Sequence, residues 1–412
     1  MSYYYECIEC GLKVEGGETI YKCHRCGDLL EIKYFYDEVE VGGKVWGRRP
    51  ISVWRYRELL PISMDARVVS LQEGGTRIHR CERLGEKFGL RRILVKHEGD
   101  NPTGSFKDRG MTVAITRAVQ EGVKLVVCAS TGNTSASMAA YAAKAGLKPL
   151  VIVPSGKIAA GKLAQAAVHG ACVIEVEGNF DDALRLVSGL TDTRRDVKLL
   201  NSINPFRIEG QKTLSMEIME QLKLKPNLIV LPVGNAGNIT AVWKGLKEFN
   251  SLGLIGETPR LIGVQAEGAA PIAHAYRTGK LNIEPVPNPE TMATAIRIGN
   301  PANWKRALRA VRDSKGAMVT VTDEEIVKAQ KMLARAEGLF AEPASAATVA
   351  ALPKLLETGL ADKSEVALCV ATGHGLKDPE AAISTMTRPL KIKPNIVELE
   401  AALKQIKGQT DV

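Results

Sequence analysis

From about residue 90 onward, the sequence alternates between short β-branched runs and Ala-rich stretches of helical character. The run RRILVKHE comes first, and then KLVVCAS precedes SASMAAYAAKAG, LKPLVIVP precedes KLAQAAVHG, and ACVIEVEG precedes FDDALRLVSGL. The same order returns where NLIVLPVGN leads into ITAVWKGLKEF, and EVALCVATGHG supplies a last apolar run. Strands that alternate with helices in this way predict an α/β fold, in which a doubly wound parallel sheet carries helices on both faces.

Length and charge narrow the class of protein. The chain has 412 residues, 45% of them hydrophobic, which is enough for an ample core and for two or three domains. No apolar stretch approaches the roughly 18 residues of a membrane span, and MSYYYECIEC is not laid out as a signal peptide, so we expect a cytoplasmic protein with no membrane partner. The net charge of +9 is scattered along the chain, so a phosphate-bearing small molecule suits its sign as well as nucleic acid does.

The first forty residues differ from the rest and predict a small separate module. Cys7, Cys10, Cys23 and Cys26 have the spacing C-x2-C-x12-C-x2-C, which is typical of a zinc ribbon that holds one metal ion. Four thiolates leave no open coordination position, so we expect a structural zinc; an unmetallated pair of redox motifs is the alternative. The other cysteines lie in helix or strand patterns and are expected to be buried packing residues: Cys81, Cys128, Cys172 and Cys369.

Polar loops follow several of the predicted strands, at the sheet edge where α/β proteins bind ligands. PVGNAGNIT opens a helix, and its glycines let the backbone approach an anion; it fits neither G-x-G-x-x-G nor a Walker A loop. ASTGNTSAS offers hydroxyl and amide groups suited to a carboxylate or phosphate, and CVATGHG places Thr372 and His374 at the same edge. An ordinary strand-to-helix turn, simple helix capping and a structural histidine are the respective alternatives.

Lys107 lies in a fourth such loop, EGDNPTGSFKDRGM, where a helix is expected to begin. A cation in the first turn of a helix opposes the macrodipole, at a cost of up to about 1 kcal/mol. This placement indicates a neutral or covalently engaged amine. The alternative is a solvated lysine paired with Asp108 or Asp100.

Seven motifs occur together and in one order: EGDNPTGSFKDRGM, STGNTSAS, NSINPFRIEGQKT, PVGNAGNIT, ATAIRIGNP, AEPASAA and ATGHGLKDP. Over roughly residues 70 to 390 the chain therefore resembles the threonine synthase family, pyridoxal-phosphate enzymes of the tryptophan-synthase-β (fold type II) group. NSINPFRIEGQKT and ATAIRIGNP point to this family within the group. The resemblance implies two doubly wound domains, which we place at residues 41–105 with 200–412 (large, cofactor-binding) and 106–199 (small), after a ribbon at 1–40.

The resemblance also implies roles for individual residues. Lys107 matches the lysine that holds the cofactor as a Schiff base, Asn133 the partner of its 3-hydroxyl, and Thr372 the partner of its pyridine nitrogen. The residues that match the loop for the cofactor phosphate are Gly234, Asn235, Ala236, Gly237 and Asn238. Those that match the substrate site are Ser130, Thr131 and Thr134, which close on the anionic ends of the substrate, and Asn201, Ser202 and Arg207, which bind its phosphate.

The reaction implied is the conversion of O-phospho-L-homoserine and water to L-threonine and phosphate by a homodimeric lyase. A cysteate-synthase-like relative that uses O-phosphoserine and sulfite is the alternative, because one methylene in a pocket is worth only about 1–3 kcal/mol. A binding role of the ribbon, added to the enzyme, is a further alternative. Nucleic acid is not expected as a partner, since the ribbon lacks the clusters of basic and aromatic residues that such binding needs.

Overall fold

The computed structural model describes residues 2–36, 41–155, 160–178, 180–383 and 389–407. Its contacts divide the chain into two units, Met1–Asp378 and Pro379–Val412. The second unit contains α13 (Pro379–Ile383) and α14 (Ile396–Lys407), and the first contains everything else. No helix in the described ranges is long and apolar enough to span a membrane.

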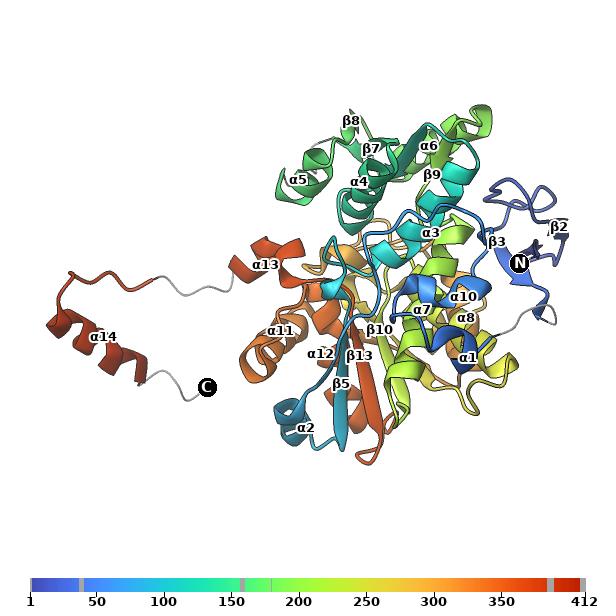
Figure 1. Cartoon of the computed structure of the whole chain (residues 1–412). Helices are drawn as coiled ribbons and strands as arrows, with labels where there is room; N and C mark the ends of the chain where they lie inside the picture. The colour runs from blue at the N-terminus through green and yellow to red at the C-terminus, as the bar shows by residue number, and fades with distance from the viewer. Residues whose placement is uncertain (1, 37–40, 156–159, 179, 384–388, 408–412) are drawn as a thin grey trace. The chain divides into compact units, whose positions relative to one another are not determined.

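A six-stranded sheet forms the centre of the first unit (Figure 1). Its strand order is β12-β11-β10-β13-β5-β4, and every pair is parallel except β4 with β5. The strands are β4 (Ile78–Arg80), β5 (Arg92–His97), β10 (Leu228–Pro232), β11 (Arg260–Ala266), β12 (Ala317–Val321) and β13 (Val366–Ala371). The predicted doubly wound sheet is thereby confirmed.

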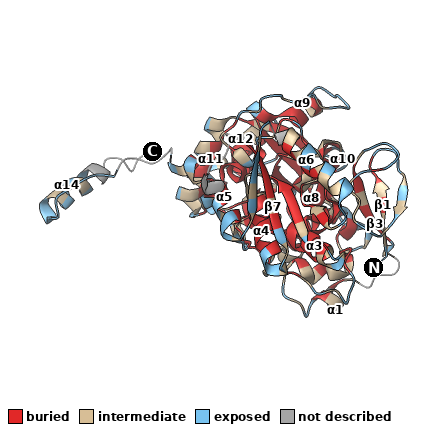
Figure 2. Ribbon diagram, turned by 90° about the horizontal axis from the view of Figure 1, so that it is seen from above, coloured by how far each residue is buried: buried red, intermediate tan, exposed pale blue. Residues whose placement is uncertain are grey.

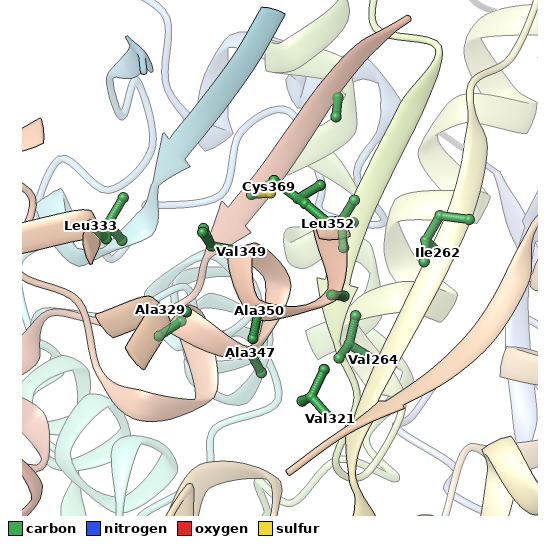
Figure 3. Close-up of a cluster of buried hydrophobic side chains, with 14 of the residues drawn as sticks. Ile262, Val264, Val321, Ala329, Leu333, Ala347, Val349, Ala350, Leu352 and Cys369 are labelled. Carbon is green, nitrogen blue, oxygen red and sulfur yellow. The ribbon is translucent and has the colours of Figure 1, made fainter. Parts of the chain in front are cut away.

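Successive side chains of a strand point to opposite faces of the sheet, and here helices cover both faces, so both are buried. In β13, Cys369 packs in one apolar cluster and Leu368 in the other. The first cluster, part of which Figure 3 shows, is covered by α2 (Glu82–Phe88), α11 (Asp323–Glu337) and α12 (Pro343–Glu357). The second is covered by α7 (Pro205–Gln221), α8 (Gly237–Ser251), α9 (Pro271–Arg277) and α10 (Trp304–Asp313), with α1 (Gly43–Trp46) beside them.

A second, four-stranded parallel sheet has the order β8-β7-β6-β9. Its strands are β6 (Leu125–Ala129), β7 (Lys148–Pro154), β8 (Cys172–Val176) and β9 (Val197–Leu199), and its helices are α3 (Lys107–Gln120), α4 (Asn133–Ala145), α5 (Ala160–Val168) and α6 (Phe180–Thr193). Cys81, Cys128 and Cys369 are buried as expected, but the prediction for Cys172 was wrong. This residue is exposed because β8 is an edge strand of the sheet.

The N-terminal module, residues 2–36, is a small antiparallel sheet of its own with the order β2-β1-β3. Its strands are β1 (Tyr3–Cys7), β2 (Lys13–Glu15) and β3 (Leu30–Tyr34). Tyr5 and Ile32 nevertheless share one buried apolar cluster with Met111 of α3, Met138 of α4 and Phe206 of α7. The module therefore packs closely against the rest of the first unit, whose strands and covering helices are largely buried (Figure 2). The domain boundaries given above remain predictions.

Candidate active site

Lys107 is the first residue of α3, as the sequence predicted. The loop before it is hydrogen-bonded to the loop that follows β13: Phe106 N donates to the carbonyl oxygen of Thr372 at 2.9 Å, and His374 N donates to that of Gly104 at 2.9 Å. The fold thus brings together Lys107 and Thr372, which the sequence separates by more than half of the chain.

Lys107 lies in surroundings that disfavour a charged amine. Burial, and secondarily the nearby guanidinium of Arg207, lower its pKa to about 7. The ion-pair alternative does not hold for either acid. Asp108 accepts hydrogen bonds from Thr103 and Ser137, and Asp100 pairs with His97 and Arg77. The sequence predicted a neutral or covalently engaged amine from its place at a helix start; in the structure, desolvation is the main cause of the lowered pKa.

Two glycines explain how Arg207 comes close to Lys107. A Cβ on Gly210 of α7 would lie 1.9 Å from the carbonyl oxygen of Arg109, and one on Gly110 of α3 would lie 2.7 Å from that of Arg207. No side chain fits at either position, so the two helices cross in backbone contact. The Arg109 side chain fixes the crossing, since it pairs with Glu98 and Glu217 at 2.6 Å each in a fully buried network.

Arg207 is a buried cation, only 2% exposed. Its Nη1 donates to the carbonyl oxygen of Leu200 at 3.0 Å, and its Nε has no hydrogen-bond partner in the described part of the chain. Burial lowers its pKa to about 10, and no carboxylate in the described ranges forms an ion pair with it. A guanidinium in this situation is suited to bind an anion, because an unpaired buried charge is costly.

The loop between β10 and α8 contains Gly234 to Asn238. Gly234 packs so tightly that a Cβ there would lie 3.0 Å from the carbonyl oxygen of Ala295, and Ala236 adopts a left-handed conformation with φ of 62°. The side chain of Asn238 is 6% exposed, and neither of its polar atoms finds a hydrogen-bond partner among the described residues. Buried amides are normally satisfied, so this loop has unused donors beside the free N–H groups of a helix start.

Asn303 holds this loop and was missed in the sequence. Its backbone N donates to the carbonyl oxygen of Asn235 at 3.2 Å, and its side-chain Nδ2 donates to that of Ser202 at 3.3 Å. Asn303 therefore ties the Gly234–Asn238 loop to the segment that precedes Arg207. Its place in GNPANW, next to one of the quoted motifs, was the available signal.

Glu342 was also missed, although AEPASAA was quoted as a motif. This carboxylate is 3% exposed; its Oε2 accepts from Asn133 Nδ2 at 3.0 Å, and its Oε1 accepts from Thr372 Oγ1 at 3.1 Å. Burial raises its pKa. Glu342 thus joins the two residues that the resemblance assigns to the cofactor ring.

The remaining polar residues lie at the ends of β6 and β9. Ser130, Thr131 and Thr134 are partly exposed around the start of α4, and Ser130 Oγ accepts from Gly132 N at 3.3 Å. The amide of Asn201 bonds both backbone groups of Ala129 at 2.9 Å, so it fixes this loop to β6.

The four cysteines of the N-terminal module form one cluster. Their sulfur atoms all lie within 4.8 Å of one another, with Cys7 and Cys26 at 3.4 Å and Cys10 and Cys23 at 3.7 Å. Tetrahedral zinc with Zn–S bonds of about 2.3 Å places sulfurs about 3.8 Å apart. The positions of the thiols fit such a site.

Comparison with known proteins agrees with this geometry. The family model described as "Pyridoxal-phosphate dependent enzyme" matches residues 69–373. The threonine synthase of Methanocaldococcus jannaschii is 54% identical over 97% of this chain and 99% of its own length, and that of Methanosarcina acetivorans is 51% identical over 97% and 98%. The chain belongs to the threonine synthase family. The resemblance inferred from the seven motifs is thus confirmed.

Solved structures extend the comparison of the threonine synthase fold. Maize serine racemase has a TM-score of 0.64 at 22% identity, covering 81% of this chain and 93% of its own. Threonine deaminase isoform 2 from Solanum lycopersicum has a TM-score of 0.63 at 22% identity, covering 75% and 83%. These similarities confirm the fold type II architecture.

The described residues of this threonine synthase family member fit pyridoxal phosphate. Lys107, with its lowered pKa, can react with the aldehyde of the cofactor. The start of α8, with the unsatisfied buried amide of Asn238, can bind its phosphate. Asn133 and Thr372, joined through Glu342, offer polar groups to its pyridine ring.

Proposed function

We propose that this protein converts O-phospho-L-homoserine and water to L-threonine and phosphate, with pyridoxal phosphate held by Lys107. The observation that carries the proposal is that Lys107, with a pKa of about 7, lies near Arg207, a buried guanidinium that lacks an ion-pair partner among the described residues. One group can accept a proton and the other can bind the substrate phosphate. Curated threonine synthases at 51–54% identity support the same reaction.

Four parts of the chain would hold the cofactor. Lys107 forms the covalent link, the N–H groups of Gly234 to Asn238 bind the phosphate, and Asn133 and Thr372 face the ring. When bound, pyridoxal phosphate withdraws electrons from the substrate α-carbon and so makes the neighbouring protons acidic. Glu342 orients Asn133 and Thr372 through the two hydrogen bonds described above.

Arg207 and its neighbours would hold the substrate. The planar guanidinium makes charge-assisted hydrogen bonds to the phosphate, and Ser202 adds a hydroxyl from the same loop. Asn201 belongs to this site as well, and its bonds to Ala129 make it a support of the loop. Ser130, Thr131 and Thr134 bind the carboxylate at the start of α4.

Lys107 would also move the protons. In the complex with substrate the amine of Lys107 would be free. A pKa near 7 lets it accept the α proton at neutral pH, give that proton up, and then accept the β proton. The phosphate would leave the γ-carbon as the β proton is removed, and the γ-carbon would then take up a proton from the Lys107 ammonium. Water would supply the hydroxyl at the β-carbon, a proton would return to the α-carbon, and the remaining proton of the water would leave with the phosphate. Arg207 retains the departed phosphate during this hydration step.

The N-terminal cysteines would bind one structural zinc ion per chain, because their sulfurs already lie at the separations of a tetrahedral site. The cytoplasmic location and the homodimer expected from the sequence remain predictions. A nucleic-acid partner is still not expected.

Phosphate release from purified protein tests the proposal. O-phospho-L-homoserine should yield phosphate and threonine in equal amounts, whereas O-phosphoserine with sulfite should yield at least about tenfold less phosphate at equal concentration. Faster release from O-phosphoserine in the presence of sulfite would favour the cysteate-synthase-like alternative.

A further inference from the structure

The N-terminal module packs against the start of α7, next to Arg207. The rings of Tyr3 and Tyr5 meet the ring of Phe206 edge to face, at centroid distances of 6.1 and 6.5 Å and interplanar angles of 89° and 75°. Phe206 is fully buried and directly precedes Arg207. Tyr3 and Tyr5 of the module thus pack behind Phe206, the neighbour of Arg207, which is the proposed ligand of the substrate phosphate.

The module also holds the other end of the same loop. Leu199 N donates to the hydroxyl oxygen of Tyr21 at 2.9 Å. Leu200, the next residue, provides the carbonyl oxygen to which Arg207 Nη1 donates at 3.0 Å. Tyr21 therefore fixes the backbone from which the guanidinium takes its hydrogen bond.

A third contact between the module and α7 lies at Glu209, one helical turn after Phe206. The hydroxyl of Tyr34 donates to Glu209, which is fully buried and also pairs with Lys212 and Lys244. Among the described residues, no hydrogen bond joins the module directly to the Gly234–Asn238 loop. The module also bonds to the end of α3, to α8 and to α10, but the contacts of Tyr3, Tyr5, Tyr21 and Tyr34 lie on or beside the segment that carries Arg207.

We propose that Tyr3, Tyr5 and Tyr21 are positioning residues for Arg207. This inference rests on the proposed function of Arg207 as the ligand of the substrate phosphate. The tyrosines hold Phe206 and Leu199, and so keep the guanidinium of a buried, otherwise unpaired arginine aimed at its anion. The N-terminal module is then a part of the substrate site, beyond any role in stability.

The substitution Tyr21→Phe in the full-chain holoenzyme tests this inference, because it removes the hydroxyl oxygen that accepts from Leu199 N and keeps the ring. Loss of a neutral hydrogen bond is worth about fivefold in an equilibrium constant, so the Kd of inorganic phosphate and the KM of O-phospho-L-homoserine should each rise about fivefold. The visible absorbance of the bound cofactor should not change. Phe206→Leu, which removes the ring that Tyr3 and Tyr5 contact, should act in the same direction.

Tyr4→Phe is the matched control. Tyr4 lies on β1 between Tyr3 and Tyr5, but its ring packs on that of Phe35 at a centroid distance of 5.3 Å, so the same chemical change should leave phosphate binding unaltered. The proposal would be overturned if the Tyr21→Phe protein unfolded at a lower temperature yet bound phosphate with the Kd of the wild type. It would also be overturned if the Tyr21→Phe protein lost its bound cofactor. Wild-type protein that binds phosphate without turning over O-phospho-L-homoserine would refute the proposed function alone, since the phosphate Kd values of the variants would still decide the positioning role.

Discussion

Replacement of Arg207 by methionine should separate substrate binding from stability. Burial lowers the pKa of Arg207 from its usual 12.5 to about 10, which means that the folded state disfavours its charged guanidinium by about 3 kcal/mol. Methionine keeps most of the volume and removes this penalty, at the loss of one hydrogen bond to Leu200 worth about 1 kcal/mol. Arg207→Met should therefore be at least as stable as the wild type without ligand, by up to about 2 kcal/mol.

Catalysis should change in the opposite direction. Charge-assisted hydrogen bonds to phosphate are worth roughly 3 kcal/mol together, so kcat/KM for O-phospho-L-homoserine should fall at least about a hundredfold. A coupled assay of phosphate release measures this loss. Arg207→Lys keeps the charge but lacks the planar pair of donors, so its kcat/KM should lie between those of the wild type and Arg207→Met.

Thermal unfolding with inorganic phosphate gives a readout independent of turnover. At ten times its Kd, phosphate should stabilise the wild type by about 1.4 kcal/mol, whereas Arg207→Met should gain much less. Equal protection of both proteins would show that phosphate binds elsewhere. A ligand-free Arg207→Met protein much less stable than the wild type would show that the arginine has an unrecognised partner, and either result refutes the reasoning.

Three further predictions concern other parts of the protein. Lys107→Ala should lower turnover at least about a hundredfold, and borohydride should no longer fix the cofactor to the peptide GSFKDR, as peptide mass spectrometry of the wild type and variant will reveal; cofactor on another lysine would contradict the assignment. Glu342→Gln removes the charge and leaves one oxygen to accept from Asn133, while its amide NH2 can only donate to Thr372 Oγ1; it should shift the pH dependence of the absorbance of the bound cofactor, and an unchanged profile would count against its place beside the ring. Elemental analysis should find one zinc per chain in the wild type and much less in Cys7→Ser, and equal contents would exclude the four-cysteine site.

Local patterns in the sequence predicted the elements and their order. The alternation of β-branched and Ala-rich runs is a consequence of strand and helix periodicity, and it predicted the parallel sheet correctly. Lys107 begins a helix where the loop chemistry indicated, and the spacing of the cysteines predicted their cluster. In each case the deciding residues are close in sequence or belong to one motif.

Contacts between distant segments could not be read in this way. The approach of Arg207 to Lys107 depends on the crossing of two helices at Gly110 and Gly210, and a glycine within a helix gives no sign of its partner. Glu342 meets Asn133 only because two sheets place their strand ends together. Cys172 followed a strand pattern, yet its burial depended on whether that strand lies at an edge.

Burial acts differently on the two cations of the site, and this difference leads to a last prediction. At neutral pH Lys107 can lose its proton, whereas Arg207, with a pKa of about 10, stays charged and lowers the pKa of the lysine. An anion on Arg207 neutralises that charge, so bound phosphate should raise the pKa of Lys107 and make it a stronger base while the phosphate is retained.

The pH dependence of cofactor uptake by the apoprotein measures this coupling, because only the neutral amine reacts with an aldehyde. Without phosphate the midpoint should lie near pH 7, with faster uptake at higher pH, and inorganic phosphate should move the midpoint upward. Arg207→Met should raise the midpoint by itself and abolish the effect of phosphate. Competition for the cofactor-phosphate loop would slow uptake at every pH but leave the midpoint in place, so a midpoint that does not move would show that the two residues are not coupled.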